Sequence, residues 1–346
     1  MHLPSEMRLV HIMQSNVNVY VDPPVSRSTR RSEEHGVPPL SSPSTSLDSV
    51  LAPAPYKILS KSDVQFGKIV SSTESTIIYE GMVCRQPALI KRNHHQVFTC
   101  PESYGTYLDR LENELALMSA LSHPNIIRCE GLCTESLQAF TVLEYMAGTV
   151  LMCRPDDRLA RPSVAALINI ALQLAEAIKY LHERGIVHGD LSAYNVMIDP
   201  KWTHLKLIDL GAASHVTPSG FVTTPSVGSH RWASPENLRR EPYGRSSDVY
   251  SFGVILWQMF TGKTPYYGAP DEMIVQSVAY RRERPVPVLR VSNSCPPEIS
   301  ELTRTCLEED PSARPTIEEV VSTLQTTISA HPSMFISGIP QSCKIM

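Results

Sequence analysis

The spacing of apolar residues changes along the chain and predicts two structurally different regions. After about residue 58, short runs rich in β-branched residues predict strands over 65–70, 75–83 and 87–92. Apolar residues at i, i+3 and i+4 then predict a helix over 104–122. IIRCEGLC and AFTVLEYM predict two further strands, so this region is mostly β with one helix.

Beyond Gly148 the same reasoning predicts mainly helices. RPSVAALINIALQLAEAIKYLHERG is amphipathic over its whole length and stops at Gly185, a residue typical of helix C-termini. VMID and HLKLID predict a hairpin, and further helices are expected over 247–262, 297–310 and 316–329. The pattern as a whole predicts an α+β fold, in which a small β-rich lobe precedes a larger α-helical lobe.

The two ends of the chain differ from these lobes. Residues 1–55 are rich in Ser and Pro and contain few large apolar residues, so they cannot bury enough surface to offset the entropy of ordering. We expect this segment to be disordered. The remaining expected boundaries are a first lobe and hinge over 58–146, a second lobe over 147–328 and a C-terminal tail over 329–346.

Composition narrows the class of partner and the compartment. The formal net charge of -4 is too close to neutral to indicate a nucleic-acid partner. The 8 cysteines show no paired spacing, and the most apolar run, over 254–260, is too short to span a bilayer. We therefore expect a cytoplasmic protein with reduced thiols.

A set of polar residues occurs in the order that phosphoryl transfer requires. That chemistry needs a Lys and metal ions to neutralise phosphate charge, and a carboxylate to orient the acceptor hydroxyl. Lys91 ends the strand-like run ALIK, and Glu114 lies on the following predicted helix. Asp190 and Asn195 share the loop IVHGDLSAYN, and Asp209 follows the next strand, in IDLGA.

Residues 58–328 resemble a eukaryotic protein kinase, most closely the tyrosine-kinase-like group. The residues above carry the resemblance, together with SPE over 234–236 and SDVYSFG over 247–253. The resemblance implies the bilobal protein kinase fold, ATP and Mg²⁺ as cofactors, and a protein as the substrate.

The resemblance also implies a role for each polar residue of the set. Lys91 would contact the α- and β-phosphates and pair with Glu114, and Asp190 would be the catalytic base. Asn195 and Asp209 would bind the metal ion.

Further residues follow from the same resemblance. Glu236 would pair with Arg314, and Asp248 would brace the loop that carries the catalytic base. Besides Lys91, the residues expected to contact the nucleotide are Ile78, Leu89 and Met197, together with Glu144 and Met146 of the hinge, whose backbone would meet the adenine.

The nucleotide-binding part departs from the family pattern in two ways. Ser71, Thr73 and Thr76 stand where the glycine-rich loop has glycine, which lets backbone N–H groups approach phosphate. This loop should therefore be stiffer. Leu89 stands where kinases have a small alanine against the adenine, and its bulk should narrow the pocket or shift the base.

The catalytic loop departs in two further ways. Gly189 replaces the Arg that receives an activating phosphate, so this switch should be absent. Ser192 and Tyr194 stand where Ser/Thr kinases carry Lys and many tyrosine kinases carry Arg. Removing one such charge donor typically slows catalysis by about 10²–10³, which predicts a slow enzyme and not a dead one.

Because all five primary groups are present, we favour an active protein kinase in intracellular signalling. GSHRWASPE resembles the corresponding segment of Ser/Thr-directed members, with Ser229 at the usual Thr position, so Ser/Thr hydroxyls are the expected acceptors. The alternative is a pseudokinase that acts as an allosteric or scaffolding module with weak or no nucleotide turnover.

The last four residues, CKIM, fit the prenylation pattern C-a-a-X at Cys343. A single prenyl chain without a preceding polybasic run would hold a membrane only weakly. Weak membrane association is one expectation, and a chance terminal cysteine is the other.

Overall fold

A computed structural model describes residues 56–73, 76–93, 111–134, 139–153, 162–222, 228–285 and 295–336. All of them belong to one compact unit that spans residues 52–346. The segment over 1–55, for which we predicted disorder, lies outside the described residues, and so does Cys343.

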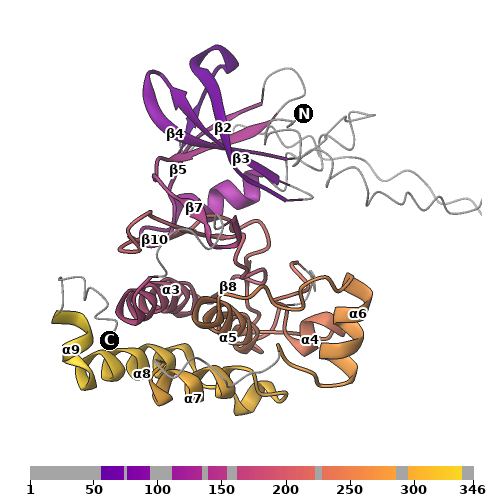
Figure 1. Cartoon of the computed structure of the whole chain (residues 1–346). Coiled ribbons are helices and arrows are strands. Elements are labelled where there is room, and N and C mark those ends of the chain that lie inside the picture. Colours follow the sequence, from indigo (N-terminus) through magenta and orange to yellow (C-terminus); the bar gives the residue numbers. More distant parts are fainter. Residues whose placement is uncertain are drawn as a thin grey trace, which may run out of the picture. The chain divides into compact units, whose positions relative to one another are not determined.

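A six-stranded sheet forms the first lobe (Figure 1). Its neighbours are antiparallel except for β1 and β5, which run parallel. The five predicted strands are confirmed; β1 was not predicted because two residues carry no periodicity. In spatial order the strands are β1 (Lys57–Ile58), β5 (Cys129–Cys133), β6 (Phe140–Glu144), β4 (Gln86–Asn93), β3 (Thr76–Val83) and β2 (Val64–Ser72).

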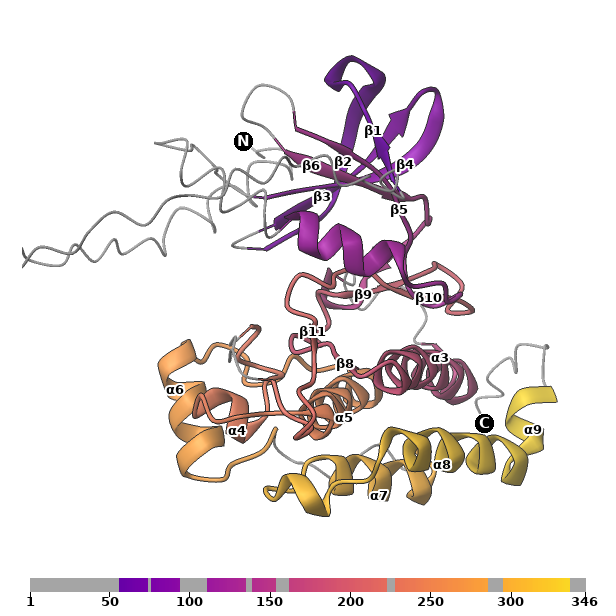
Figure 2. The same cartoon turned by 180° about the vertical axis from the view of Figure 1, so that it is seen from behind.

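The helix expected over 104–122 is described from residue 111 and runs to residue 119. Leu111, Leu115 and Met118 are buried, as the i, i+3 and i+4 pattern predicts. Figure 2 shows this helix beneath the sheet, on the side that faces the second lobe. The packing of its apolar stripe fixes the rotation of the helix, and with it the direction of Glu114.

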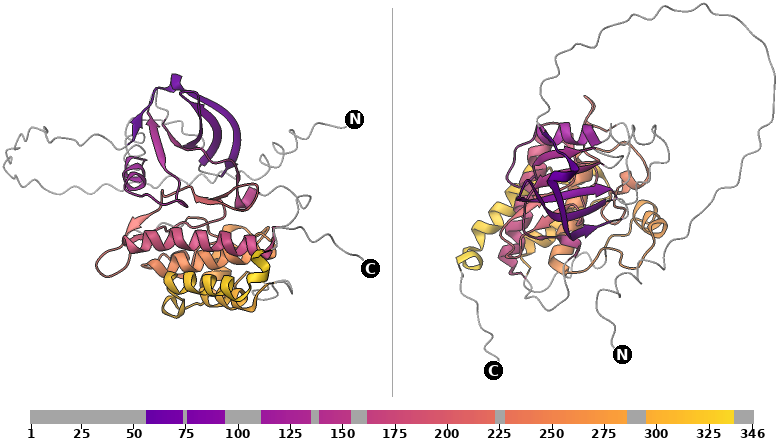
Figure 3. Two further views of the ribbon diagram at one scale, coloured as in Figure 1. Left: turned by 90° about the vertical axis from the view of Figure 1, so that its left-hand side faces the viewer. Right: turned by 90° about the horizontal axis from the view of Figure 1, so that it is seen from above.

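The second lobe is mainly helical (Figures 1 and 3). The predicted long helix begins after Ser163, whose side chain accepts from the N–H of Ala166, and ends before Gly185, which has a φ of 70°. The helices are α3 (Val164–Glu183), α4 (Pro235–Leu238), α5 (Arg245–Thr261), α6 (Asp271–Val275), α7 (Pro297–Cys306), α8 (Ile317–Ala330) and α9 (Pro332–Ile336).

Helix α3 lies in the core of this lobe. Within the described residues it is the one helix long and apolar enough to cross a membrane, by length and composition alone. The helix is longer than the run over 254–260, so that run is not the longest apolar segment of the described residues. Eleven of its residues are buried in the lobe, among them Ile168 and Leu174 at 0% exposure, so its apolar character is explained by helix packing.

Three short ladders hold the loops between the lobes. The predicted hairpin is confirmed as β9 (Val196–Ile198) and β10 (Leu205–Leu207), and β7 (Thr149–Val150) adds to it. β8 (Ile186–Val187) pairs with β11 (Ser214–His215). The helical part extends beyond the expected boundary at residue 328, because α8 reaches Ala330 and α9 follows.

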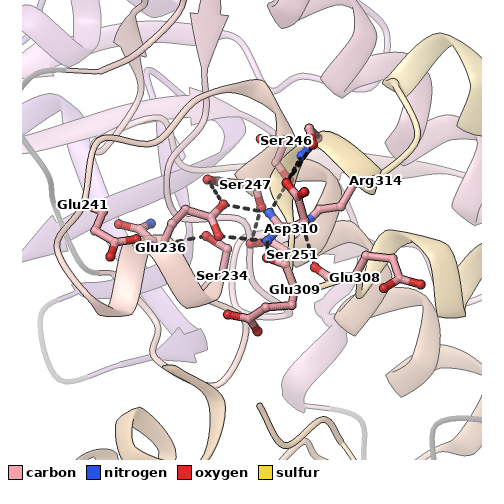
Figure 4. A network of polar contacts seen from close by, with 12 residues as sticks. Ser234, Glu236, Glu241, Ser246, Ser247, Ser251, Glu308, Glu309, Asp310 and Arg314 are labelled. Atoms are coloured by element: carbon pink, nitrogen blue, oxygen red, sulfur yellow. Dashed lines mark hydrogen bonds and ion pairs between the residues drawn. The ribbon is translucent and has the colours of Figure 1, made fainter. Parts of the chain in front are cut away.

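A buried ion pair ties α4 to the segment before α8 (Figure 4). Arg314 donates from both terminal nitrogens to the Glu236 carboxylate, at 2.7 and 2.8 Å. The Ser247 hydroxyl donates to Glu236 Oε1 at 2.7 Å, and Arg314 also donates to the carbonyls of Ser246, Glu308 and Glu309. The pairing expected from the sequence is confirmed, and it is fully hydrogen-bonded, as a buried ion pair needs to be.

Candidate active site

The loop that carries Asp190 is held from below by α5. Asp248 Oδ1 accepts from the N–H of Gly189 at 3.0 Å, and Oδ2 accepts from the N–H of His188 at 2.8 Å. His182 Nε2 lies 2.8 Å from the same Oδ2. Asp248 is almost fully buried, so these contacts replace its hydration and fix the backbone just before Asp190, as predicted.

Asp190 presents one carboxylate oxygen to the space between the lobes. Its Oδ1 accepts from the N–H of Ser229 at 2.8 Å, while Asn195 donates to its carbonyl at 2.8 Å and lies 3.5 Å from Oδ2. Burial raises the pKa of Asp190 above its ordinary value, against the opposing effect of the Ser229 N–H. Oδ2 is therefore placed to accept a proton.

Gly228 makes this arrangement sterically possible. A Cβ at this position would lie 2.2 Å from the Asp190 carboxyl carbon. Any side chain here would push Asp190 away from the Ser229 N–H, so the glycine before Ser229 is a requirement of the site.

Lys91 joins two carboxylates from different parts of the chain. Its Nζ lies 2.6 Å from Glu114 Oε1 and 2.9 Å from Asp209 Oδ1, and its side chain is 7% exposed. Burial works against the ammonium, but the charges of Asp209 and Glu114 hold the pKa of Lys91 above its ordinary value. The predicted pairing of Lys91 with Glu114 is confirmed, and Asp209 belongs to the same cluster.

The donor set at Asp209 and Asn195 fits a divalent metal. Burial alone would raise the pKa of Asp209, but the neighbouring Lys91 ammonium holds it below its ordinary value, so this carboxylate is ionised. Asn195 uses its Nδ2 on Asp190, which leaves its amide oxygen as a ligand. No group of three or more His, Cys, Asp or Glu forms a metal cluster among the residues described, so phosphate and water would have to complete the coordination.

Part of this set lines one cavity of about 540 Å³, whereas Lys91 and Glu114 are not among its lining residues. Four predicted site residues line the cavity, Ile78 and three polar ones; we call the part lined by the polar ones the catalytic end: Asp190, Asn195 and Asp209. Thr73 and Thr76, which flank the connection between β2 and β3, line the cavity, and it extends to Asp271 at the start of α6. The lining residues outside the catalytic end are Ser71, Thr73, Thr76, Ile78, Tyr194, Gly228, Ser229, His230, Arg231, Trp232 and Asp271.

The cavity does not extend to the other expected nucleotide contacts. Leu89, Met146 and Met197 are buried in one hydrophobic cluster with Ile78, and Leu89 and Met197 are 0% exposed. We call these three residues the base end. The bulk of Leu89, noted in the sequence, occupies space there, and Ile78 is the one expected apolar nucleotide contact among the cavity residues.

The Glu144 side chain has a structural role of its own, separate from the backbone contact with the adenine that is expected of the hinge. Its Oε1 accepts from Lys206 Nζ at 2.6 Å and from the N–H of Arg128 at 3.0 Å, and its own N–H donates to the Arg128 carbonyl. The side chain therefore braces the sheet against β10 and does not line the cavity.

The connection between β2 and β3 is closed by hydrogen bonds between the residues that flank it. The N–H of Thr73 donates to the Thr76 carbonyl at 2.8 Å, and the N–H of Thr76 donates to Thr73 Oγ1 at 3.0 Å. These bonds restrict the backbone at two of the positions where a glycine-rich loop would be flexible, in agreement with the stiffness expected from the sequence.

The position of the missing Arg is closed by packing. Gly189 has a φ of 75°, and a Cβ there would lie 2.9 Å from Tyr243 Oη and 3.0 Å from the Ala212 carbonyl. Tyr243 is buried with Val187 and Val222, and the N–H of Val222 donates to its carbonyl at 2.8 Å. A cluster of Val187, Val222 and Tyr243 therefore packs beside Gly189 and holds the activation segment at Val222, at the place where the family has a phosphate-binding Arg.

Several residues of the cavity were not predicted as site residues, among them Gly228, His230, Arg231, Trp232 and Asp271. The motif GSHRW identified this segment through its resemblance to Ser/Thr-directed kinases. The motif did not indicate that Gly228 contacts Asp190. Asp271 lies 81 positions after Asp190 and has no local motif; only the folded chain brings it to the cavity.

The sequence profile of the protein tyrosine and serine/threonine kinase family matches residues 64–324. That match covers most of the chain and all the polar residues of the cavity. The chain belongs to this family. Proteins of the family use ATP and a divalent metal, and the donor set described above suits both.

Several named protein kinases are similar to this kinase domain. Serine/threonine/tyrosine-protein kinase HT1 of Arabidopsis thaliana is 29% identical over 76% of this chain and 66% of its own length. STY46 of the same plant is 29% identical, over 76% of this chain and 44% of its own. The probable serine/threonine-protein kinase drkA of Dictyostelium discoideum is 33% identical over 64% of this chain and 34% of its own.

The matches span from 34% to 66% of the length of these three curated relatives. The similarity therefore covers the kinase domain and leaves out large parts of most of the relatives.

Proposed function

We propose that this chain transfers the γ-phosphate of ATP to Ser or Thr hydroxyls of proteins, with Mg²⁺ as the metal. The observation that carries the proposal is the Lys91 cluster. Its Nζ lies 2.6 Å from Glu114 and 2.9 Å from Asp209, and Asp209 lines the same cavity as Asp190 and Asn195. This spatial order matches the requirements of phosphoryl transfer.

Each group has a distinct task in this proposal. The acceptor oxygen attacks the γ-phosphorus, the bond to the bridging oxygen of ADP breaks, and the hydroxyl proton passes to Asp190 Oδ2. The Ser229 N–H keeps Oδ1 in place, which points Oδ2 at the acceptor. The Lys91 ammonium would bind phosphate oxygens while Glu114 orients it.

Asn195 and Asp209 would hold Mg²⁺, which neutralises charge on the phosphates. Ser192 and Tyr194 supply no positive charge to the transferred phosphate, so we expect a slow enzyme. The relatives named as serine/threonine-protein kinases support Ser/Thr acceptors.

The test has a binding arm and a transfer arm. Mg-ATP should raise the melting temperature, because a ligand that binds only the folded state stabilises it. Radiolabelled ATP should label the protein itself or a generic Ser/Thr substrate. Lys91→Ala and Asp209→Asn should lose both signals, whereas Asp190→Asn should keep the thermal shift and lose the label.

The pseudokinase alternative makes the opposite forecast in the transfer arm. No label at millimolar Mg-ATP, with equal thermal shifts for the wild type and Asp190→Asn, would overturn the proposed activity. The named protein kinases among the relatives and the formed Lys91 cluster support the enzyme over this alternative.

The sequence provides a second, independent proposal about location. If Met346 is the last residue of the protein, Cys343 would be prenylated, and a cytoplasmic protein would associate weakly with membranes. The wild type and Cys343→Ser should then differ in the membrane fraction. Equal distributions would refute this proposal and leave the kinase activity untouched.

A further inference from the structure

The cavity has an acceptor side that the proposed chemistry does not use. From Asp190 the lining continues along the segment Gly228–Trp232 and reaches Asp271, the first residue of α6. A substrate whose hydroxyl meets Asp190 Oδ2 must lay its neighbouring residues against this wall. The charges of the wall then select among substrates.

Asp271 is the accessible charge of this wall. Its side chain is 58% exposed, and its Oδ2 lies 3.1 Å from His230 Nδ1. The imidazole is itself only 30% exposed, so it holds the carboxylate in one direction at the cavity edge. An accessible, positioned carboxylate is a recognition group for an ammonium or guanidinium.

Arg231, the arginine among the described wall residues, uses three of its five N–H donors on backbone carbonyls. Arg231 donates to the carbonyls of Pro265, Tyr266 and Ala269, at 3.0, 2.6 and 3.2 Å. These bonds fasten the segment that leads to α6 against the wall. They also keep the guanidinium turned to the backbone, so Asp271 can meet a cation that comes from the substrate.

We propose that Asp271, positioned by His230, selects protein substrates with a Lys or Arg close to the acceptor Ser or Thr. This inference rests on the proposed kinase activity for its biological meaning, but it concerns the binding of the peptide and can be measured without transfer.

The experiment compares peptide sets in which a fixed Ser is flanked by Lys, Ala or Asp at each nearby position. Phosphorylation rates are measured with Mg-ATP. Binding of the Ser→Ala versions is measured by fluorescence anisotropy with Mg²⁺ and a non-hydrolysable ATP analogue. The proteins are the wild type, Asp271→Asn, Asp271→Lys and His230→Ala. Glu272→Lys is the matched control, since Glu272 is the exposed neighbour in sequence and is absent from the lining of the cavity.

The wild type should prefer Lys over Asp by about five-fold at one position, as expected for a partly exposed ion pair. Asp271→Asn should abolish the preference, Asp271→Lys should reverse it, and His230→Ala should reduce it. Glu272→Lys should leave it in place. The preference should also shrink in 0.5 M NaCl, because exposed charges are screened.

Two outcomes would overturn the inference: a wild type without charge preference in binding, or an unchanged preference in Asp271→Lys. Transfer to all peptides without preference would remove this inference and keep the proposed activity. Selective binding of Lys peptides without any transfer would support recognition by Asp271 and refute the proposed kinase activity.

Discussion

At the catalytic end of the cavity, the side chains of Asp190, Asn195 and Asp209 line open space, whereas at the base end apolar side chains fill the space themselves. Lys91 lies between Glu114 and Asp209, and Asp190 lines the cavity, while Leu89 and Met197 have no exposed surface. The difference teaches that the groups proposed for transfer are already in position without nucleotide, and we expect Leu89 at the base end to hinder the adenine. Kinetics and binding should therefore respond differently to changes at the two ends.

The largest effect is expected at the catalytic end, from Asp190→Asn. Phosphoryl transfer should fall by about 10²–10⁴, because the acceptor hydroxyl loses its base. The fold should not weaken, since burial raises the pKa of Asp190, which means that its charge costs free energy on folding, and Asn has no such charge. Initial rates and melting temperatures check both parts. Retained activity, or a melting temperature several degrees lower, would contradict this view.

Lys91→Met should damage both activity and stability. It leaves the buried Glu114 carboxylate and the partly exposed Asp209 carboxylate without their shared cation, and breaking a buried pair such as Lys91–Glu114 costs about 3–5 kcal/mol. Denaturant unfolding measures the loss. The double variant Lys91→Met/Glu114→Gln removes one of the two charges and should recover part of the stability. If it recovers none, the buried charges are not the cause.

The base end is tested by Leu89→Ala. The variant should lose about 2–4 kcal/mol of stability through the cavity it creates, and yet bind Mg-ATP about ten-fold more tightly, because the space for the base is open. Leu132→Ala is the matched control: it truncates a buried Leu of the same sheet in a different cluster, and should lose stability without any gain in affinity. Equal affinities for both variants would show that the base end does not limit nucleotide entry.

Gly189→Ala tests a smaller effect, in the packing that replaces the phosphate-binding Arg. The positive φ costs about 1–2 kcal/mol for a residue with a Cβ, and the Cβ also meets Tyr243 and the Ala212 carbonyl. Stability should fall by at least that amount. Phosphatase treatment of the wild type should leave its rate unchanged, because an apolar cluster holds the activation segment. A rate that depends on phosphorylation would disprove this form of control.

The smallest effect is a shift in the pH profile. Transfer needs the Asp190 carboxylate, and its raised pKa means that protonation begins at a higher pH than for an ordinary Asp. The rate should therefore fall on acidification with a midpoint above 3.8, the ordinary value. Melting temperatures at each pH separate this effect from unfolding. A midpoint at or below 3.8 would place Asp190 in a wetter surrounding than the fold gives it.

Most of the local structure follows from the sequence. The strands of the first lobe and the long helices have periodic apolar residues, and their ends carry local signals, such as Ser163 before α3 and the Thr316–Glu319 capping box of α8. The strands and α-helices that were missed are short: β1, β7, β8, β11, α4, α6 and α9 span two to five residues each. Such segments contain too few residues for a period, and their form is decided by the surfaces they rest on.

Part of the site was predictable for a different reason. Lys91, Glu114, Asp190, Asn195 and Asp209 were identified from their type and order, because phosphoryl transfer requires that combination of charges. The extent of the cavity was not predictable. Whether Leu89 merely narrows the base end or fills it depends on how Ile78, Met146 and Met197 pack around it.

By itself, the sequence determined the secondary structure of the long elements, the family and the identity of the charged groups, because each depends on neighbouring residues or on a fixed order along the chain. The tertiary structure alone decided which atoms meet. Gly228 lies against Asp190, Tyr243 closes the space beside Gly189, and Asp271 reaches the acceptor side of the cavity. These contacts join residues that are far apart in sequence. Their geometry is set by the packing of the helices and strands between them, which no short stretch of sequence encodes.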